Sequence, residues 1–150
     1  MKLALVSPLP PLDGPAAALV ERLLPLLEER GDVRLLPHAP EQVDAEVAAA
    51  AAMEPAAELP RLLRDGVVDV PIYVVGGGEA HAYQLRFVRE HPGVVVLLTG
   101  NLHRLVAADT VDSGDVEAYR AALCEDYGAA AADWPERLLA MEASRRRRAE

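Results

Sequence analysis

The sequence predicts an α/β fold, an open Rossmann-like parallel sheet of about four strands with helices on both faces. Three observations predict it: short apolar runs alternate with segments of helical periodicity, turn residues separate them, and the last apolar run shows no polar alternation. Runs that are apolar on both sides are typical of parallel strands covered by helices. A length of 150 residues fits one domain, so we expect a single Rossmann-like domain over residues 1–150.

The first elements follow from apolar runs and prolines. Residues 2–7 form a short apolar run before a proline-rich loop, as expected of a buried first strand. Leucines at helical spacing then predict a helix that starts near Pro15, is kinked by Pro25 and ends at Gly31. Residues 32–36 predict the second strand.

The middle of the chain predicts two helices, a strand and a third helix. Residues 41–53 are alanine-rich, which favours a helix, and residues 56–64 predict another. The third strand lies within residues 67–75, and we expect it to begin at Pro71 because proline cannot donate to a strand ladder. A helix over residues 80–91 follows.

The last third of the chain predicts one more strand and three helices. Residues 94–98 are apolar throughout and predict the fourth strand. Helices are expected over residues 102–107, 115–132 and 134–148, and Asp133 is a plausible cap for the last.

Composition excludes several functions. The net charge of −9 argues against nucleic-acid binding, and the basic run at residues 145–148 is interpreted as a solvated helix end or linker. Lys2 is the single lysine, which excludes a P-loop and a Schiff-base enzyme. Cys124 is the single cysteine, which excludes an intrachain disulfide and fits the cytoplasm. No run reaches the length of a membrane span, and a peripheral membrane contact stays open.

Ligands of open α/β sheets bind beyond the carboxyl ends of the strands, and three predicted loops lie there. These loops cover residues 8–15, 76–78 and 99–101. The glycine triplet at 76–78 suits an anion beside a helix N-terminus, although a tight turn required by packing explains it equally well. The triplet is not a dinucleotide fingerprint, because His81 occupies the last glycine position of that motif.

Two histidines follow these loops, so both are placed to face one crevice. His81 lies one turn into the helix after the third strand, and His103 lies one turn past the fourth. The alternative for each is a solvent-exposed or internally bonded histidine. Neither is spaced from other ligands as zinc sites require, so we predict no metal. No serine lies in a nucleophile motif and no carboxylate pair stands out, so no catalytic residue is assigned.

Three segments resemble the N-terminal, acceptor-side domain of bacterial family 4 glycosyltransferases, which have the GT-B fold. Residues 2–27, with S-P-L-P-P and the leucine-rich helix, are similar to the family's first strand, loop and helix. Residues 73–82, Y-V-V-G-G-G-E-A-H-A, resemble the family motif Y-Q-x-G-N-x-x-x-H-A. Residues 91–97, H-P-G-V-V-V-L, match the family's H-P-G-V-V-V-L, and an L-H pair follows at 102–103.

The resemblance implies part of a retaining, metal-independent enzyme without a cofactor. A C-terminal domain beyond this chain would hold the nucleotide-sugar donor, and this chain would form the wall facing a sugar or lipid-linked acceptor. The resemblance places the following residues on this wall: Gly14, Gly76, Gly77, His81, Thr99 and His103.

The chain departs from the family at polar positions, which keeps a second hypothesis open. Val74 and Gly77 stand where the family has Gln and Asn, and Leu98-Thr99 stands where it has His-Asp. These losses favour a stand-alone, non-catalytic α/β binding or interaction module derived from such a domain. A stand-alone nucleotide-binding enzyme ranks third, supported by the glycine triplet alone. Self-association through an exposed sheet edge also stays open.

Overall fold

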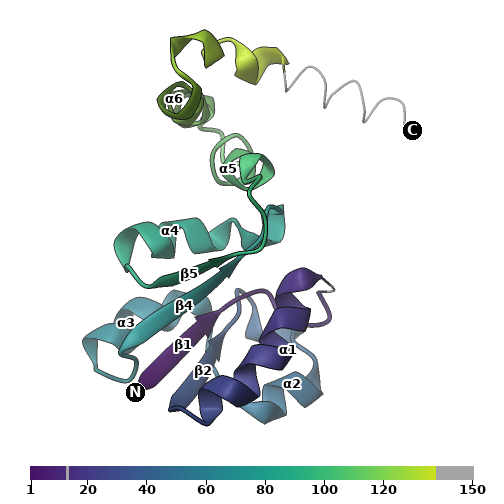
Figure 1. The fold of residues 1–150 in the computed structure, drawn as a ribbon, viewed down its shortest axis with the longest axis vertical. Coiled ribbons are helices and arrows are strands. Elements are labelled where there is room, and N and C mark those ends of the chain that lie inside the picture. Colours follow the sequence, from purple (N-terminus) through teal and green to yellow (C-terminus); the bar gives the residue numbers. More distant parts are fainter. Residues whose placement is uncertain (13, 138–150) are drawn as a thin grey trace. The chain divides into compact units, whose positions relative to one another are not determined.

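The computed structural model describes residues 1–12 and 14–137. Within these residues the backbone forms two compact units, one over Met1–Leu105 and one that begins at Val106. Figure 1 shows the strands of the first unit gathered in one sheet. That residues 1–150 form a single domain stays a prediction.

The first unit alternates strands with helices. In chain order these are β1 (Lys2–Val6), α1 (Pro15–Glu28), β2 (Asp32–Leu36), α2 (Ala45–Ala50), β3 (Ala52–Met53), α3 (Leu59–Arg64), β4 (Val70–Val75), α4 (Tyr83–Glu90) and β5 (Val94–Leu97). Short 3₁₀ helices lie at Pro40–Gln42, Ala56–Glu58 and Glu79–His81. The chain then continues through α5 (His103–Thr110), α6 (Val116–Tyr127) and a 3₁₀ turn at Ala129–Ala131.

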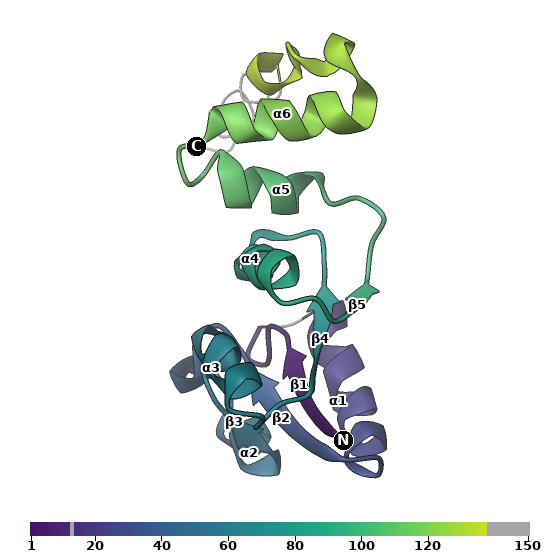
Figure 2. The same cartoon turned by 90° about the vertical axis from the view of Figure 1, so that its left-hand side faces the viewer.

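The five strands form one sheet in the order β3-β2-β1-β4-β5, and every neighbouring pair is parallel. β1 is central, since Leu5 lies opposite Leu35 of β2 and Ile72 of β4. Figure 2 shows α1 on one side of this sheet and α3 and α4 on the other. The open parallel sheet with helices on both faces confirms the predicted Rossmann-like fold class.

Alternate strand residues supply two cores, one on each face of the sheet. The core beneath α1 and α2 includes Leu3, Leu5, Val20, Leu24, Leu35, Ile72 and Val74. The core beneath α3 and α4 includes Ala4, Val6, Leu36, Leu59, Leu62, Tyr73, Val75 and Phe87. The period of two along β1 and β4 therefore divides each strand between both layers.

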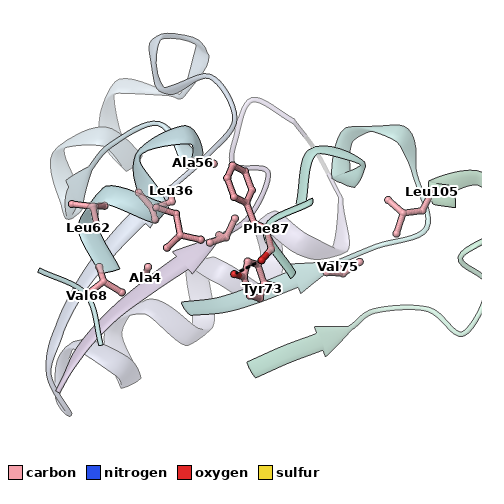
Figure 3. Packing of buried hydrophobic residues seen from close by; sticks show 11 residues of the cluster. Ala4, Leu36, Ala56, Leu62, Val68, Tyr73, Val75, Phe87 and Leu105 are labelled. Atoms are coloured by element: carbon pink, nitrogen blue, oxygen red, sulfur yellow. Dashed lines mark hydrogen bonds between the residues drawn. The ribbon is translucent and has the colours of Figure 1, made fainter. Parts of the chain in front are cut away.

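Tyr73 connects β4 to the end of α4, as Figure 3 shows for its contact with Phe87. Its hydroxyl donates to the carbonyl oxygen of His91 at 2.6 Å and lies 3.2 Å from that of Phe87. Burial raises the pKa of Tyr73 to about 12, so this hydroxyl stays protonated as a donor at neutral pH.

The structure corrects the expected helix over residues 41–53. That segment contains the 3₁₀ turn at Pro40–Gln42, the short helix α2 and the two-residue strand β3. Ala51 has the extended backbone angles φ −148° and ψ 160°, which end the helix, and Met53 packs into the core on the α1 face. Tertiary packing therefore overrides the helix propensity of alanine here and adds a fifth strand.

Two glycines lie where the backbone approaches another segment closely. α1 runs through Pro25 and ends at Glu28, before the expected stop at Gly31. A Cβ at Gly31 would lie 2.1 Å from the carbonyl oxygen of Met1, so this glycine lets β1 and β2 start side by side. Gly93 has a similar role, because a Cβ there would lie 2.3 Å from the carbonyl oxygen of Pro71.

The structure agrees with the prediction for β4 and differs from the prediction for β5. β4 begins at Val70, so Pro71 lies close to its start as expected. β5 was expected to be covered on both faces, but it is the edge strand of the sheet. Its residues Val94, Val95 and Leu97 are 52%, 40% and 55% exposed. A continuous apolar run therefore does not guarantee a central strand.

The second unit is described as far as residue 137 and is helical. Asp115 caps α6 by accepting a hydrogen bond from the Ala118 amide at 2.9 Å, and Gly128, with φ 80°, ends it. Tyr119 and Leu123 pack on Ala131 in a small core of this unit. The predicted helix over residues 134–148 lies mostly outside the described residues. No helix among residues 1–12 and 14–137 is both long and apolar enough to cross a bilayer.

Candidate functional site

The order of the strands identifies one position in the sheet where a ligand would be expected. From β1 the chain moves outward through β2 and β3, then returns to place β4 on the other side of β1. The helices that follow β1 and β4 consequently lie on opposite faces of the sheet. In open α/β sheets, ligands bind beyond the carboxyl ends of the strands at this reversal. The loops that contain residues 7–12 and 76–82 flank it.

His81 is fixed against the loop that leaves β4. Its Nδ1 lies 3.1 Å from the carbonyl oxygen of Val74, and its ring packs over Gly76. A Cβ at Gly76 would lie 2.7 Å from Nε2, so a larger residue there would push the ring away. Two of the predicted site residues, Gly76 and His81, are therefore brought into direct contact.

The surroundings of His81 keep its imidazole neutral at physiological pH. Burial lowers its pKa from the ordinary value of 6.5, and the hydrogen bond to Val74 opposes this only in part. A carbonyl oxygen can only accept, so Nδ1 carries the proton and Nε2 is left as an acceptor. His81 is thus suited to accept a hydrogen bond from a ligand hydroxyl or N–H group.

The loops after β4 and β5 meet at Gly77. A Cβ at Gly77 would lie 2.6 Å from the carbonyl oxygen of Asn101 and 3.0 Å from Cγ2 of Thr99. Gly77 and Thr99, both predicted to belong to the site, are therefore adjacent. The close approach accounts for the glycine at position 77 as a packing requirement.

The polar side chains of the β5 loop are used within the loop itself. Thr99 Oγ1 accepts a hydrogen bond from the Asn101 amide at 3.1 Å, and Asn101 Oδ1 accepts one from the His103 amide at 3.1 Å. The second bond gives the N–H at the start of α5 an acceptor, as a capping residue does. Asn101 therefore positions the start of α5. It was not among the predicted site residues, although an Asn just before a predicted helix is a signal for a capping role.

His103 and Gly14 are placed at the ends of helices. His103 is the first residue of α5 and is half-exposed. Gly14 is the N-cap of α1 with φ 155° and carries no side chain to cap it. The positions of these residues agree with loops at the carboxyl edge of the sheet. That His103 shares a ligand with His81 stays a prediction.

A buried amide beside the site escaped sequence analysis. Gln84 of α4 is fully buried, its Oε1 has no hydrogen-bond partner, and its Nε2 makes a long contact of 3.5 Å with the Tyr83 hydroxyl. The Tyr83 ring lies 5.0 Å from that of His38, which follows β2. Burial raises the pKa of Tyr83, so its hydroxyl stays protonated. A glutamine in an amphipathic helix gives no sequence signal for such burial.

A surface hollow of about 590 Å³ lies at the opposite, amino-terminal edge of the sheet. It is lined by Lys2, Gly31, Asp32, Arg34, Ala52 and Val67, among others. Its two cationic groups already have protein partners, because Lys2 Nζ bonds the Gly66 carbonyl and Arg34 bonds Glu54. The cations that line the hollow are therefore already paired and do not favour an anionic ligand, so we take the carboxyl edge as the candidate site.

The arrangement at the carboxyl edge can position a ligand but shows no acid and base pair. Glu79 is exposed, and it is the single carboxylate in residues 76–82. Among the described residues, no group of three or more potential metal ligands is gathered. The chemistry available is hydrogen bonding from the loop amides and to Nε2 of His81.

Comparison with known proteins identifies no relative of this chain. No protein-family description, no curated protein and no solved structure matches the chain. The fold class is therefore established by the structure itself, and the function is inferred from the candidate site.

Proposed function

We propose that the Rossmann-like unit forms the acceptor-side wall of a sugar-transfer site in a retaining, metal-independent GT-B glycosyltransferase. In this proposal a separate donor-binding domain holds the nucleotide-sugar, and the loops after β1, β4 and β5 hold a sugar or lipid-linked acceptor. The observation that carries the proposal is the neutral His81 fixed over Gly76 where the strand order reverses. The motif at residues 73–82 adds the family resemblance.

The residues suit recognition of a hydroxyl-rich ligand. An imidazole whose Nδ1 is bonded to the backbone presents one acceptor, and an acceptor hydroxyl supplies the matching donor. Gly76 and Gly77 let the His81 ring and the β5 loop pack closely against the β4 loop, which fixes the position of that acceptor. Catalysis would come from positioning and electrostatic complementarity once both walls of the cleft are present.

A second function, a stand-alone binding or interaction module, is favoured by the β5 loop. Thr99 and Asn101 use their side-chain oxygens in local hydrogen bonds, and Thr99 lies where the family motif carries an aspartate that lines the cleft. A module of this kind would bind its ligand or partner without turnover.

The direct test is an NMR titration of the ¹⁵N-labelled chain with mono- and disaccharide acceptors and with common nucleotide-sugars. We expect acceptor sugars to shift the amide resonances of residues 76–81 and 99–101, and nucleotide-sugars to bind weakly. Submicromolar binding of a nucleotide-sugar to this chain alone would contradict the proposed division of labour.

Two variants of the same loop make the titration specific. Gly76→Ala should weaken sugar binding, because the new Cβ displaces the His81 ring. Gly78→Ala is the matched control, since a Cβ there meets nothing within 4 Å. Equal binding by both variants would remove His81 from the site.

The mass of the endogenous protein separates the two functions. A species more than about twice the chain mass of 16.1 kDa is expected for an enzyme with a donor domain, because one domain rarely accounts for that size. A species at 16.1 kDa would favour the stand-alone module.

A further inference from the structure

Gln84 is a buried polar side chain whose hydrogen-bonding capacity the fold leaves partly unused. It is the second residue of α4 and fully buried, and its Oε1 has no hydrogen-bond partner among the residues that the structure describes. Its Nε2 makes only a long contact of 3.5 Å with the Tyr83 hydroxyl. Turning the amide over would exchange its oxygen and nitrogen, but Tyr83 offers a single oxygen, so one end of the amide stays unpaired in either orientation.

An unpaired buried amide lowers the stability of a folded chain. A buried donor or acceptor without a partner carries the full cost of its desolvation, and native structures contain few such groups. An apolar side chain of the same size would avoid this cost, so stability alone does not explain a glutamine at this position. Positions that break the rules of packing and hydrogen bonding are expected chiefly at functional sites.

The unpaired amide lies at the carboxyl edge of the sheet, where a ligand is expected. The Tyr83 ring lies 5.0 Å from the ring of His38, which follows β2, whereas Tyr83 follows β4. β2 and β4 are the two neighbours of β1, so this contact joins the segments that follow the strands on either side of the reversal. His38 is exposed, Tyr83 is half-buried and Gln84 is buried. Tyr83 therefore connects the surface of the carboxyl edge with the buried amide.

The two groups at the inner end of this cluster match a hydroxyl group. Tyr83 accepts from Gln84 Nε2 and has no acceptor for its own proton among the described residues, so its O–H can donate. Oε1 of Gln84 can only accept. One hydroxyl can donate to Oε1 and accept from Tyr83 at the same time. Both protein groups are neutral, and burying an anion or a cation against neutral groups alone is far more costly.

We infer that Gln84 and Tyr83 form a subsite for one neutral hydroxyl of the ligand. The inference rests on the proposed function, because it takes sugars as the ligands of the carboxyl edge, and it adds a pair of specificity-determining residues beyond the motif at residues 73–82. Gln84 is fully buried in the free chain, so a hydroxyl reaches it only after Tyr83, which contacts both Gln84 and His38, changes its position. The amide is then satisfied only when the sugar is bound.

Replacing the amide by an apolar side chain of the same length distinguishes a ligand site from a structural bond. Gln84→Met removes the unpaired groups, so without sugar its melting temperature should equal or exceed that of the wild type. Gln42→Met is the matched control, since Gln42 is the other glutamine of the chain and is exposed. Gln84→Leu repeats the measurement with a side chain of different shape. Lower melting temperatures for both Gln84 variants would show that the amide is bonded in the free chain, for example to a buried water, and would overturn the inference.

An NMR titration of the ¹⁵N-labelled full chain measures the subsite directly. The probes are the methyl glycosides of glucose, galactose and mannose, with the derivatives in which one hydroxyl at a time is replaced by hydrogen. In the wild type and in Gln42→Met, one derivative should bind at least about fivefold more weakly than its parent glycoside. Gln84→Met should bind the parent at least about fivefold more weakly than the wild type does, and it should no longer distinguish the parent from that derivative.

The inference and the proposed function fail in different ways. If a glycoside binds the wild type and Gln84→Met binds it equally well, the hydroxyl subsite is refuted and the proposed function stands. The same conclusion follows if Gln84→Met still distinguishes the parent glycoside from every derivative as the wild type does. If no sugar binds the wild type, the proposed function fails, and the inference that rests on it is refuted as well.

Discussion

Replacing Gly77 by alanine tests whether the loops after β4 and β5 pack as closely as the structure indicates. The new Cβ would lie 2.6 Å from the Asn101 carbonyl oxygen and 3.0 Å from Thr99 Cγ2. Because the nearer neighbour is backbone, the loop itself must move, and overpacking of this kind costs about 1 to 3 kcal/mol. Gly78 is the matched control, since its φ of −96° suits alanine and a Cβ there meets nothing within 4 Å.

The two variants should differ clearly in stability. Alanine restricts the unfolded chain equally at positions 77 and 78, so this contribution cancels and the expected gap is the overpacking cost of about 1 to 3 kcal/mol. In a unit of this size 1 kcal/mol shifts the melting temperature by about 4 to 8 °C, so Gly77→Ala should melt at least about 4 °C below Gly78→Ala. Thermal denaturation followed by circular dichroism measures this. Equal melting temperatures would refute the contact between the two loops.

Three further substitutions test the fold around the site by urea denaturation. Burial lowers the folded pKa of His81 below 6.5, so the unfolded chain binds more protons below that pH and stability falls on acidification. His81→Gln should therefore lose less stability than the wild type between about pH 7 and pH 5, and an identical loss would contradict the buried neutral ring. Tyr73→Phe removes the donor that connects β4 to the end of α4 and should cost about 1 kcal/mol; no change in stability would show that this bond contributes nothing. Gly31→Ala places a Cβ 2.1 Å from the Met1 carbonyl oxygen and should cost about 3 kcal/mol or more, whereas Gly100→Ala, with nothing within 4 Å, should be tolerated.

The sheet was largely predictable because local sequence patterns indicate most of its strands. Residues 2–7 and 94–98 are apolar runs, and residues 32–36 lie between Gly31 and Pro37; each of these segments contains a strand of the structure. β3 was not predictable, because two residues after an alanine-rich stretch carry no periodic signal. Strand order depends on which runs pair, so the sequence could not reveal that β5 lies at the edge.

The candidate site was predictable as a set of loops and less so as a set of contacts. Turn residues after apolar runs located the loops at 76–78 and 99–101. The meeting of Gly77 with Asn101 depends on β4 and β5 being neighbours, which is a property of the whole sheet. Gln84 shows the same limit, since its burial depends on what α4 packs against.

The polar groups at the carboxyl edge can recognise a ligand, but they do not supply the charge that a reaction would need. Thr99 and Asn101 use their side-chain oxygens to hold the β5 loop, whereas His81 retains Nε2 as an acceptor. A neutral acceptor can fix the position of a hydroxyl, but it carries no charge to stabilise a developing one, and Glu79 beside it is exposed. The loops at this edge therefore fit a binding role under both proposed functions. The two functions differ in whether a second wall brings the charged groups that sugar transfer needs, so turnover in the presence of a donor domain, rather than affinity for a sugar, is the property that distinguishes them.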